Sequence, residues 1–158
     1  RNNPETTHRK NKLSARVTAS GKGAYPMAEN RRGQALISIV DDDESIRKGL
    51  GRLFRSVGFD VHGFASAEDF LDSTDLQLSS CLILDVRMPG MGGLELQSRL
   101  VAGLSQIPII FLTAHSDEQS RAQALKAGAL HFVSKPFTEA SLIHDVNTAI
   151  DQYRLKGH

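Results

Sequence analysis

Hydrophobic and polar positions follow two alternating patterns from Leu36 to the end of the chain. Short, almost wholly apolar runs predict strands, and apolar residues that recur every three or four positions predict amphipathic helices. Strands are predicted over 36–40, 59–64, 81–86, 107–113 and 129–134. Helices are predicted after residue 43 or 45 up to residue 58, and over 66–73, 94–102, 116–128 and 138–156. This strict alternation predicts an α/β fold, in which helices cover both faces of a parallel sheet through right-handed crossovers.

Polar caps and glycines mark the ends of the predicted helices. Asp43 or Ser45 can cap the first helix, and Gly58 can end it. Ser66 precedes an acidic residue by three positions, which resembles a capping box. Gly128 is placed to end the helix that begins near residue 116.

The residues that follow the strands carry most of the chemistry in this chain. They are Asp41, Asp42 and Asp43 after the first strand, Asp85 at the end of the third, Thr113 at the end of the fourth and Lys135 after the fifth. In open parallel sheets, sites form beyond the carboxyl ends of the strands. If the first, third, fourth and fifth strands lie side by side, three or more carboxylates, one hydroxyl and one ammonium group converge there.

This set of groups suits a magnesium-dependent phosphoryl acceptor. Clustered carboxylates without a counter-charge have raised pKa values and destabilise a fold. Mg²⁺ removes this difficulty, because it takes carboxylate, water and phosphate oxygens as ligands. An Asp beside the ion can act as a nucleophile and become an aspartyl phosphate. A Lys ammonium group and a Thr hydroxyl can then stabilise the oxygens of the incoming phosphoryl group.

Charge and composition divide the chain into a lead-in and a body. Residues 1–34 are polar, lack apolar periodicity and are predicted to be disordered: a tag, a remnant or an upstream extension, with Met27 as a candidate native start. A basic arm that binds an acidic partner is the alternative. Residues 35–156 are predicted to form one domain.

The charge of the two parts and the apolar content narrow the classes of function. Residues 1–35 carry a net charge of +6 and the rest of the chain −5, so the body lacks the basic surface of a nucleic-acid-binding domain. No apolar run is long enough to span a membrane. The single cysteine, Cys81, suits a reducing cytoplasmic setting and is expected to be a small core residue.

Four blocks of the sequence resemble the receiver domain of bacterial two-component response regulators. They are "LISIVDDDESIRKGL", "CLILDVRMPGMGGLEL", "IPIIFLTAHSD" and "ALKAGALHFVSKPF". The resemblance covers Leu36 to Tyr153 and is strongest to the subgroup with a C-terminal LuxR-type helix-turn-helix output domain. It implies a flavodoxin-like (βα)5 doubly wound sheet with the strand order 2-1-3-4-5.

The resemblance also implies roles for the groups at the strand ends. Asp85 would be the phosphoacceptor. Mg²⁺ would be held by Asp41, Asp42, Asp85 and the backbone carbonyl of Arg87, with one of the first two acting through water. Lys135 would pair with the phosphoryl group. Asp43 falls outside the metal-binding pair and is expected to cap a helix.

Further residues would transmit the signal or tune its lifetime. Thr113 would move toward the phosphoryl group, and Phe132 would occupy the aromatic switch position, where many members of the family have Tyr. Arg87 and His115 occupy positions that modulate the lifetime of the phosphoryl group in the family. The Lys135–Pro136 bond would be cis.

The function implied by the resemblance is a phosphorylation switch, not an enzyme with turnover. A sensor histidine kinase would supply the phosphoryl group. The face formed by residues 116–128, 129–134 and 138–156 would support a homodimer or partner docking. The output DNA-binding domain is absent from this chain, so an excised receiver of a transcription regulator is expected. The alternative is a stand-alone receiver that acts in a phosphorelay or through protein contacts.

Two other classes of function stay open. A phosphatase of the haloacid-dehalogenase type would also use an Asp nucleophile after a strand. It would need a second Asp two residues later, where Arg87 stands. A phosphorylation-independent binding module with the same fold usually lacks the acceptor, an acid or the lysine, and this chain has all of them.

Overall fold

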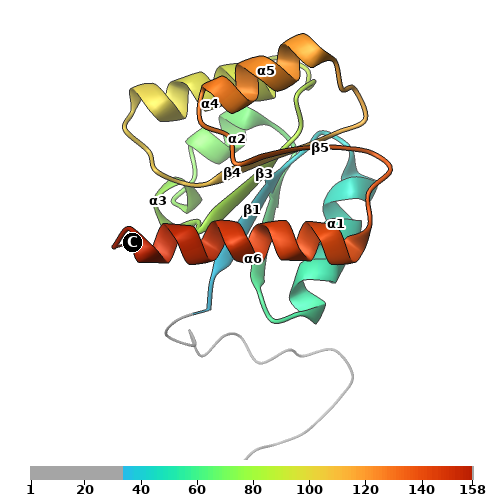
Figure 1. Cartoon of the computed structure of the whole chain (residues 1–158), viewed down its shortest axis with the longest axis vertical. Helices are drawn as coiled ribbons and strands as arrows, with labels where there is room; N and C mark the ends of the chain where they lie inside the picture. The colour runs from blue at the N-terminus through green and yellow to red at the C-terminus, as the bar shows by residue number, and fades with distance from the viewer. Residues whose placement is uncertain (1–33, 158) are drawn as a thin grey trace, which may run out of the picture. The chain divides into compact units, whose positions relative to one another are not determined.

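Five parallel strands form one sheet in the computed structural model, which describes residues 34–157. The strands are β1 (Leu36–Val40), β2 (Asp60–Phe64), β3 (Cys81–Leu84), β4 (Ile109–Thr113) and β5 (His131–Ser134). Their order in the sheet is β2-β1-β3-β4-β5, which confirms the predicted flavodoxin-like topology (Figure 1). This order places β1, β3, β4 and β5 next to one another, as the convergence of the strand-end groups requires.

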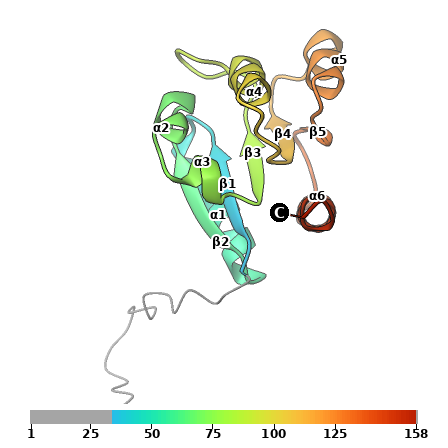
Figure 2. The same cartoon turned by 90° about the vertical axis from the view of Figure 1, so that its left-hand side faces the viewer.

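Within residues 34–157, six helices accompany the sheet. They are α1 (Glu44–Ser56), α2 (Ala67–Leu71), α3 (Asp75–Leu78), α4 (Gly93–Ala102), α5 (Glu118–Lys126) and α6 (Glu139–Leu155). Viewed along the sheet, α2 and α3 lie on one side and α6 on the other (Figure 2). None of the helices among residues 34–157 is long and apolar enough to cross a membrane.

Alternate side chains of the strands build a separate core on each face of the sheet, since successive residues of a strand point to opposite faces. In β1, Ile37 and Ile39 pack with buried residues of α1 and α6. Val40 faces the other way, into the core that includes buried residues of α2, α4 and α5. Cys81 is fully buried in the α1–α6 core, as expected, and burial raises the pKa of its thiol to about 12.

Several predicted helix boundaries are confirmed by hydrogen bonds and backbone conformation. Asp43, not Ser45, caps α1, and its side chain accepts hydrogen bonds from the backbone N–H groups of Ser45 and Ile46. Ser66 caps α2 in the same way. Gly58 and Gly128 follow α1 and α5 with φ of 99° and 104°, a left-handed conformation that favours glycine.

The segment between α2 and β3 differs from the sequence prediction, which had no helix there. The short helix α3 forms over Asp75–Leu78, and Thr74 precedes it without a side-chain cap. Asp75 is buried and pairs with His62 of β2, 2.5 Å away. Four residues give too short a window to show helical periodicity, and the pairing with β2 is not visible in the local sequence.

The strands β2, β3, β4 and β5 are shorter than predicted. The apolar runs continue beyond the hydrogen-bonded ladders, because residues such as Val86 and Ile107 are buried next to a strand without belonging to it. At the start of β4, Pro108 accepts a hydrogen bond from Leu82 but has no N–H to donate. Burial and strand pairing therefore end at different residues. The predictions for residues 1–33, including Met27, lie outside the described residues.

Candidate functional site

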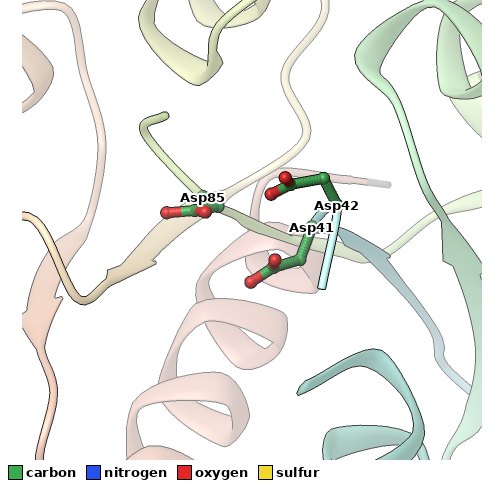
Figure 3. A group of neighbouring side chains, drawn as sticks. All are labelled: Asp41, Asp42 and Asp85. Carbon is green, nitrogen blue, oxygen red and sulfur yellow. The ribbon is translucent and has the colours of Figure 1, made fainter. Parts of the chain in front are cut away.

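Three carboxylates meet beyond the carboxyl ends of β1 and β3. Asp41 and Asp42 follow β1, and Asp85 follows β3, which pairs directly with β1. Each of the three offers a carboxylate oxygen that lies within 4.8 Å of the other two (Figure 3). The convergence predicted from the strand ends is therefore confirmed for these three residues.

Asp41 is the most constrained member of this carboxylate cluster, which we define as Asp41, Asp42 and Asp85. Its side chain is buried, and one oxygen accepts a hydrogen bond of 2.9 Å from the backbone N–H of Asp43. The other oxygen lies 3.9 Å from the Nζ atom of Lys135. Its backbone carbonyl accepts a hydrogen bond of 2.6 Å from Arg47 of α1. The side chain is thus held by the backbone of Asp43 and by Lys135, while Arg47 of α1 holds the backbone of Asp41.

The protein raises the pKa of Asp41 from 3.8 to about 6. Burial is the largest cause, because it penalises the charged form, and the negative charges of Asp85 and Asp42 add to it. The hydrogen bond from Asp43 and the charge of Lys135 act in the opposite direction but do not compensate. The carboxylate cluster therefore has less positive charge nearby than its full ionisation needs.

Asp85 lies where β3 ends and the loop to α4 begins. Only 8% of its surface is exposed, and one side-chain oxygen accepts a hydrogen bond of 2.8 Å from the N–H of Val86. The first residue of α4, Gly93, passes so close that an added Cβ atom would be 2.0 Å from the carbonyl oxygen of Asp85. A residue without a side chain is therefore required at position 93.

Thr113 and Lys135 are brought together by the end of the sheet. The backbone N–H of Lys135 donates a hydrogen bond of 3.0 Å to the carbonyl of Thr113. The side chain of Thr113 is fully buried, and its hydroxyl oxygen accepts a hydrogen bond of 3.0 Å from the N–H of His115. The Lys135–Pro136 bond is cis, as predicted. The structure thus places the predicted ammonium group beside Asp41 and next to the strand that presents the hydroxyl.

Phe132 is in a buried position. Its ring lies 5.8 Å from the ring of Phe111, measured between centroids, in the core on the side of α4 and α5. Its carbonyl accepts a long hydrogen bond of 3.4 Å from Arg121 of α5. Phe132 is therefore a core residue in this structure, and its role as an aromatic switch stays a prediction.

The two positions predicted to tune the phosphoryl lifetime, Arg87 and His115, are exposed. The guanidinium group of Arg87 lies 3.8 Å from the carboxylate of Asp117, the residue that caps α5. His115 is exposed in the loop between β4 and α5. Asp43 does not belong to the carboxylate cluster and caps α1 instead, as predicted.

Sequence reasoning missed two residues that shape this site. Nothing in the local sequence shows that Gly93 lies against the carbonyl of Asp85. Arg47 was read as part of a helix, and its hydrogen bond to the carbonyl of Asp41 depends on how α1 packs beside β1. In both cases the contact joins residues from different elements.

The carboxylate cluster has the ligands that a hard divalent cation takes. All of its donors are oxygens, and one of them belongs to a buried group whose charged form the protein disfavours. Mg²⁺ binds one or two carboxylates together with water and phosphate oxygens, so this donor set fits it.

Comparison with known proteins assigns the chain to a family. Residues 37–147 match the family described as "response regulator receiver domain". The chain belongs to this family. It is 41% identical over 142 residues to nodulation protein W of Bradyrhizobium diazoefficiens, covering 90% of this chain and 61% of that protein. It is 40% identical over 116 residues to the transcriptional regulatory protein FixJ of the same organism, covering 73% of this chain and 57% of that protein.

Solved structures show the same likeness. The receiver domain superposes on the response regulator StyR with a TM-score of 0.73 at 42% identity, covering 78% of this chain and 63% of that one. The chain therefore spans about three fifths of the length of the relatives it matches. It is similar to the receiver part of two-component response regulators, and transcription regulators are among its relatives.

Proposed function

We propose that this receiver domain is a phosphorylation switch in which Asp85 accepts a phosphoryl group from a partner histidine kinase. The observation that carries the proposal is the carboxylate cluster, in which Asp85 lies beside two further acids at the carboxyl edge of the sheet. A side-chain oxygen of Asp85 attacks phosphorus, the bond from phosphorus to the donor nitrogen breaks, and an acyl phosphate forms.

We infer that Mg²⁺ is held by Asp41, Asp42, Asp85 and the backbone carbonyl of Arg87. The ion would neutralise the negative charge that gathers when the phosphoryl group approaches the acids. The chain's own residues do the rest. The backbone N–H of Asp43 orients Asp41, and Lys135 supplies a second positive charge at the site.

The switch would start at Thr113 and Phe132. The hydroxyl oxygen of Thr113 accepts a hydrogen bond from the backbone N–H of His115, and its own hydrogen can be donated to a phosphoryl oxygen. Movement of Thr113 would change the packing at Phe132, which has no hydroxyl and so depends on packing alone. The face formed by α5, β5 and α6 would then become a surface for a homodimer or a partner.

The transcription regulators among the relatives support a transcriptional output for a longer protein that contains this receiver. A DNA-binding domain of the LuxR-type helix-turn-helix class is the output that we propose. A stand-alone receiver, acting in a cytoplasmic phosphorelay or through protein contacts, is the alternative. In both cases the receiver is a switch that catalyses only its own phosphorylation and dephosphorylation.

The proposal is tested by incubating the protein with Mg²⁺ and acetyl phosphate and measuring its mass. We expect one phosphoryl adduct on the parent protein, none when Mg²⁺ is chelated, and none on Asp85→Asn. Asp43→Asn is the matched control, because it removes a neighbouring acid while keeping a good cap, and it should be phosphorylated like the parent. If as much Asp85→Asn as parent protein carries the phosphoryl adduct, the proposal is wrong.

A further inference from the structure

A hydrogen bond joins the two ends of the loop that would carry the fourth magnesium ligand, the carbonyl of Arg87. The loop runs from Arg87 to Gly92, between β3 and α4. At its base, the N–H of Gly93 donates a hydrogen bond of 2.9 Å to the carbonyl of Val86. This bond closes the loop but does not by itself determine how the residues between its ends are arranged.

A carboxylate from another helix reaches the far side of this loop. Glu68, in the first turn of α2, accepts a hydrogen bond of 3.0 Å from the backbone N–H of Met91. The two residues are 23 positions apart in the sequence. Glu68 has a lowered pKa because it accepts backbone hydrogen bonds, first from its own N–H and then from that of Met91. The carboxylate of Glu68 is therefore engaged as an acceptor by the backbone of this loop.

The loop is shaped to bring its backbone against this carboxylate. Gly90 has φ of 74°, a conformation that residues with side chains rarely adopt. A Cβ atom at Gly90 would lie 3.0 Å from the same Oε1 atom of Glu68 that accepts the Met91 N–H. The glycine thus permits both the turn and the close approach of the loop to α2.

The helix that carries Glu68 is anchored in the core, although the side chain of Glu68 is exposed. Its helix neighbours Ala67 and Phe70 are fully buried, and the ring of Phe70 packs edge-on against Phe64 with centroids 5.4 Å apart. Met91 is buried in the same core as Phe70. A side chain on a fixed base that bonds a loop backbone restricts the conformations open to that loop.

We propose that Glu68 is a positioning residue for the phosphorylation site. It holds the loop of residues 87–92, and with it the carbonyl of Arg87, in the conformation that binds Mg²⁺. This inference rests on the proposed function, because it needs the carbonyl of Arg87 to be a ligand. A partner that orients a metal ligand commonly changes metal affinity by about tenfold or more, so the effect of losing it is measurable.

Three substitutions separate the hydrogen bond from the charge. Glu68→Gln keeps the reach and an acceptor oxygen without the charge, Glu68→Asp keeps the charge but is one methylene too short, and Glu68→Ala loses both. Asp69→Ala is the matched control, since Asp69 is also exposed on α2 and its described hydrogen bond is from its backbone N–H to Ser66. Magnesium affinity is measured by calorimetry, and exchange of the Met91 amide hydrogen is followed by NMR without the ion.

We expect magnesium binding to weaken about fivefold to tenfold in Glu68→Ala and Glu68→Asp, and to change less than about twofold in Glu68→Gln and Asp69→Ala. The Met91 amide should exchange faster in the first two variants only. Equal affinity in all variants, or a Glu68→Gln variant as weak as Glu68→Ala, would overturn the inference. If Glu68→Ala does not fold, the contrast between Glu68→Asp and Glu68→Gln decides in the same way. A parent protein that binds no Mg²⁺ would instead overturn the proposed function.

Discussion

At the scale of single residues, Asp41 is where burial and charge conflict. The side chain is almost completely buried, yet two further carboxylates lie beside it and the ammonium group of Lys135 is 3.9 Å away. Burial and the neighbouring negative charges together raise its pKa to about 6. A site that binds a divalent cation has to accept such a cost, because the ligands that attract the ion repel one another when it is absent.

The pKa of Asp41 predicts how the metal-free protein responds to pH. The folded state keeps a proton on Asp41 up to about pH 6, whereas the unfolded chain loses it near pH 3.8. The stability contributed by this proton is complete below pH 3.8 and is lost as the pH rises through 6. The free energy of unfolding of Asp41→Asn should therefore exceed that of the parent by about 1–3 kcal/mol at pH 7.5. This difference should shrink toward pH 4.

The measurement is urea unfolding in a chelating buffer across this pH range. Asp43→Asn serves as the control, because it removes an acid of the same run while keeping the cap of α1, and its stability should stay close to that of the parent. An Asp41→Asn protein that is less stable than the parent at pH 7.5 without metal would show that the cluster is not repulsive.

At the scale of elements, the way α4 begins decides the geometry around Asp85. The helix starts at Gly93, directly against the carbonyl of Asp85 and 3.1 Å from the ring of Phe111, when distances are taken from an added Cβ. The contact lets α4 lie close to the end of β3 and keeps the loop of residues 87–92 short. A side chain at position 93 would have to push the helix away from the strand that carries the phosphoacceptor.

Two glycines in helices should respond in opposite ways to the same substitution. Gly93→Ala should lower the free energy of unfolding by about 1–3 kcal/mol or more, because the added methyl group overlaps backbone that cannot move freely. Gly49→Ala in α1 should raise it by about 0.5–1 kcal/mol, because an added Cβ meets nothing within 4 Å and alanine favours the helix. Thermal and urea unfolding of the two variants check this. Equal effects of the two substitutions would contradict the close contact at Gly93.

At the scale of the whole molecule, the sheet separates two cores and carries the site at one edge. One core packs α1 and α6 against one face of the sheet, and the other, with α2, α4 and α5, contains Phe111 and Phe132. The residues proposed to sense phosphorylation therefore belong to the face opposite α1. Under the proposed function, a change at Thr113 would reach α5 through Phe132, whose carbonyl accepts a hydrogen bond from Arg121 of α5.

Binding of Mg²⁺ should stabilise the whole molecule by mass action. A ligand that binds only the folded state adds about 1.4 kcal/mol at about ten times its dissociation constant. The melting temperature of the parent should rise with MgCl₂ but not with NaCl at the same ionic strength. The rise should be lost in Asp85→Asn, which removes one of the three acids. A melting temperature that responds equally to both salts would argue against specific binding.

Features that depend on residues close together in the chain follow from the sequence alone. The apolar runs marked all five strands, and Asp43, Ser66 and Gly58 marked helix ends, because periodicity and capping act over three or four positions. The resemblance to receiver domains supplied the order of the strands. Together they predicted that Asp41, Asp42 and Asp85 would meet, which the structure confirms.

Contacts between distant elements depend instead on the packing of the folded chain. The helix α3, the approach of Gly93 to Asp85 and the hydrogen bond from Met91 to Glu68 all depend on how one element packs on another. The raised pKa of Asp41 is of the same kind, because burial arises from every element around a side chain and not from the residues next to it in sequence.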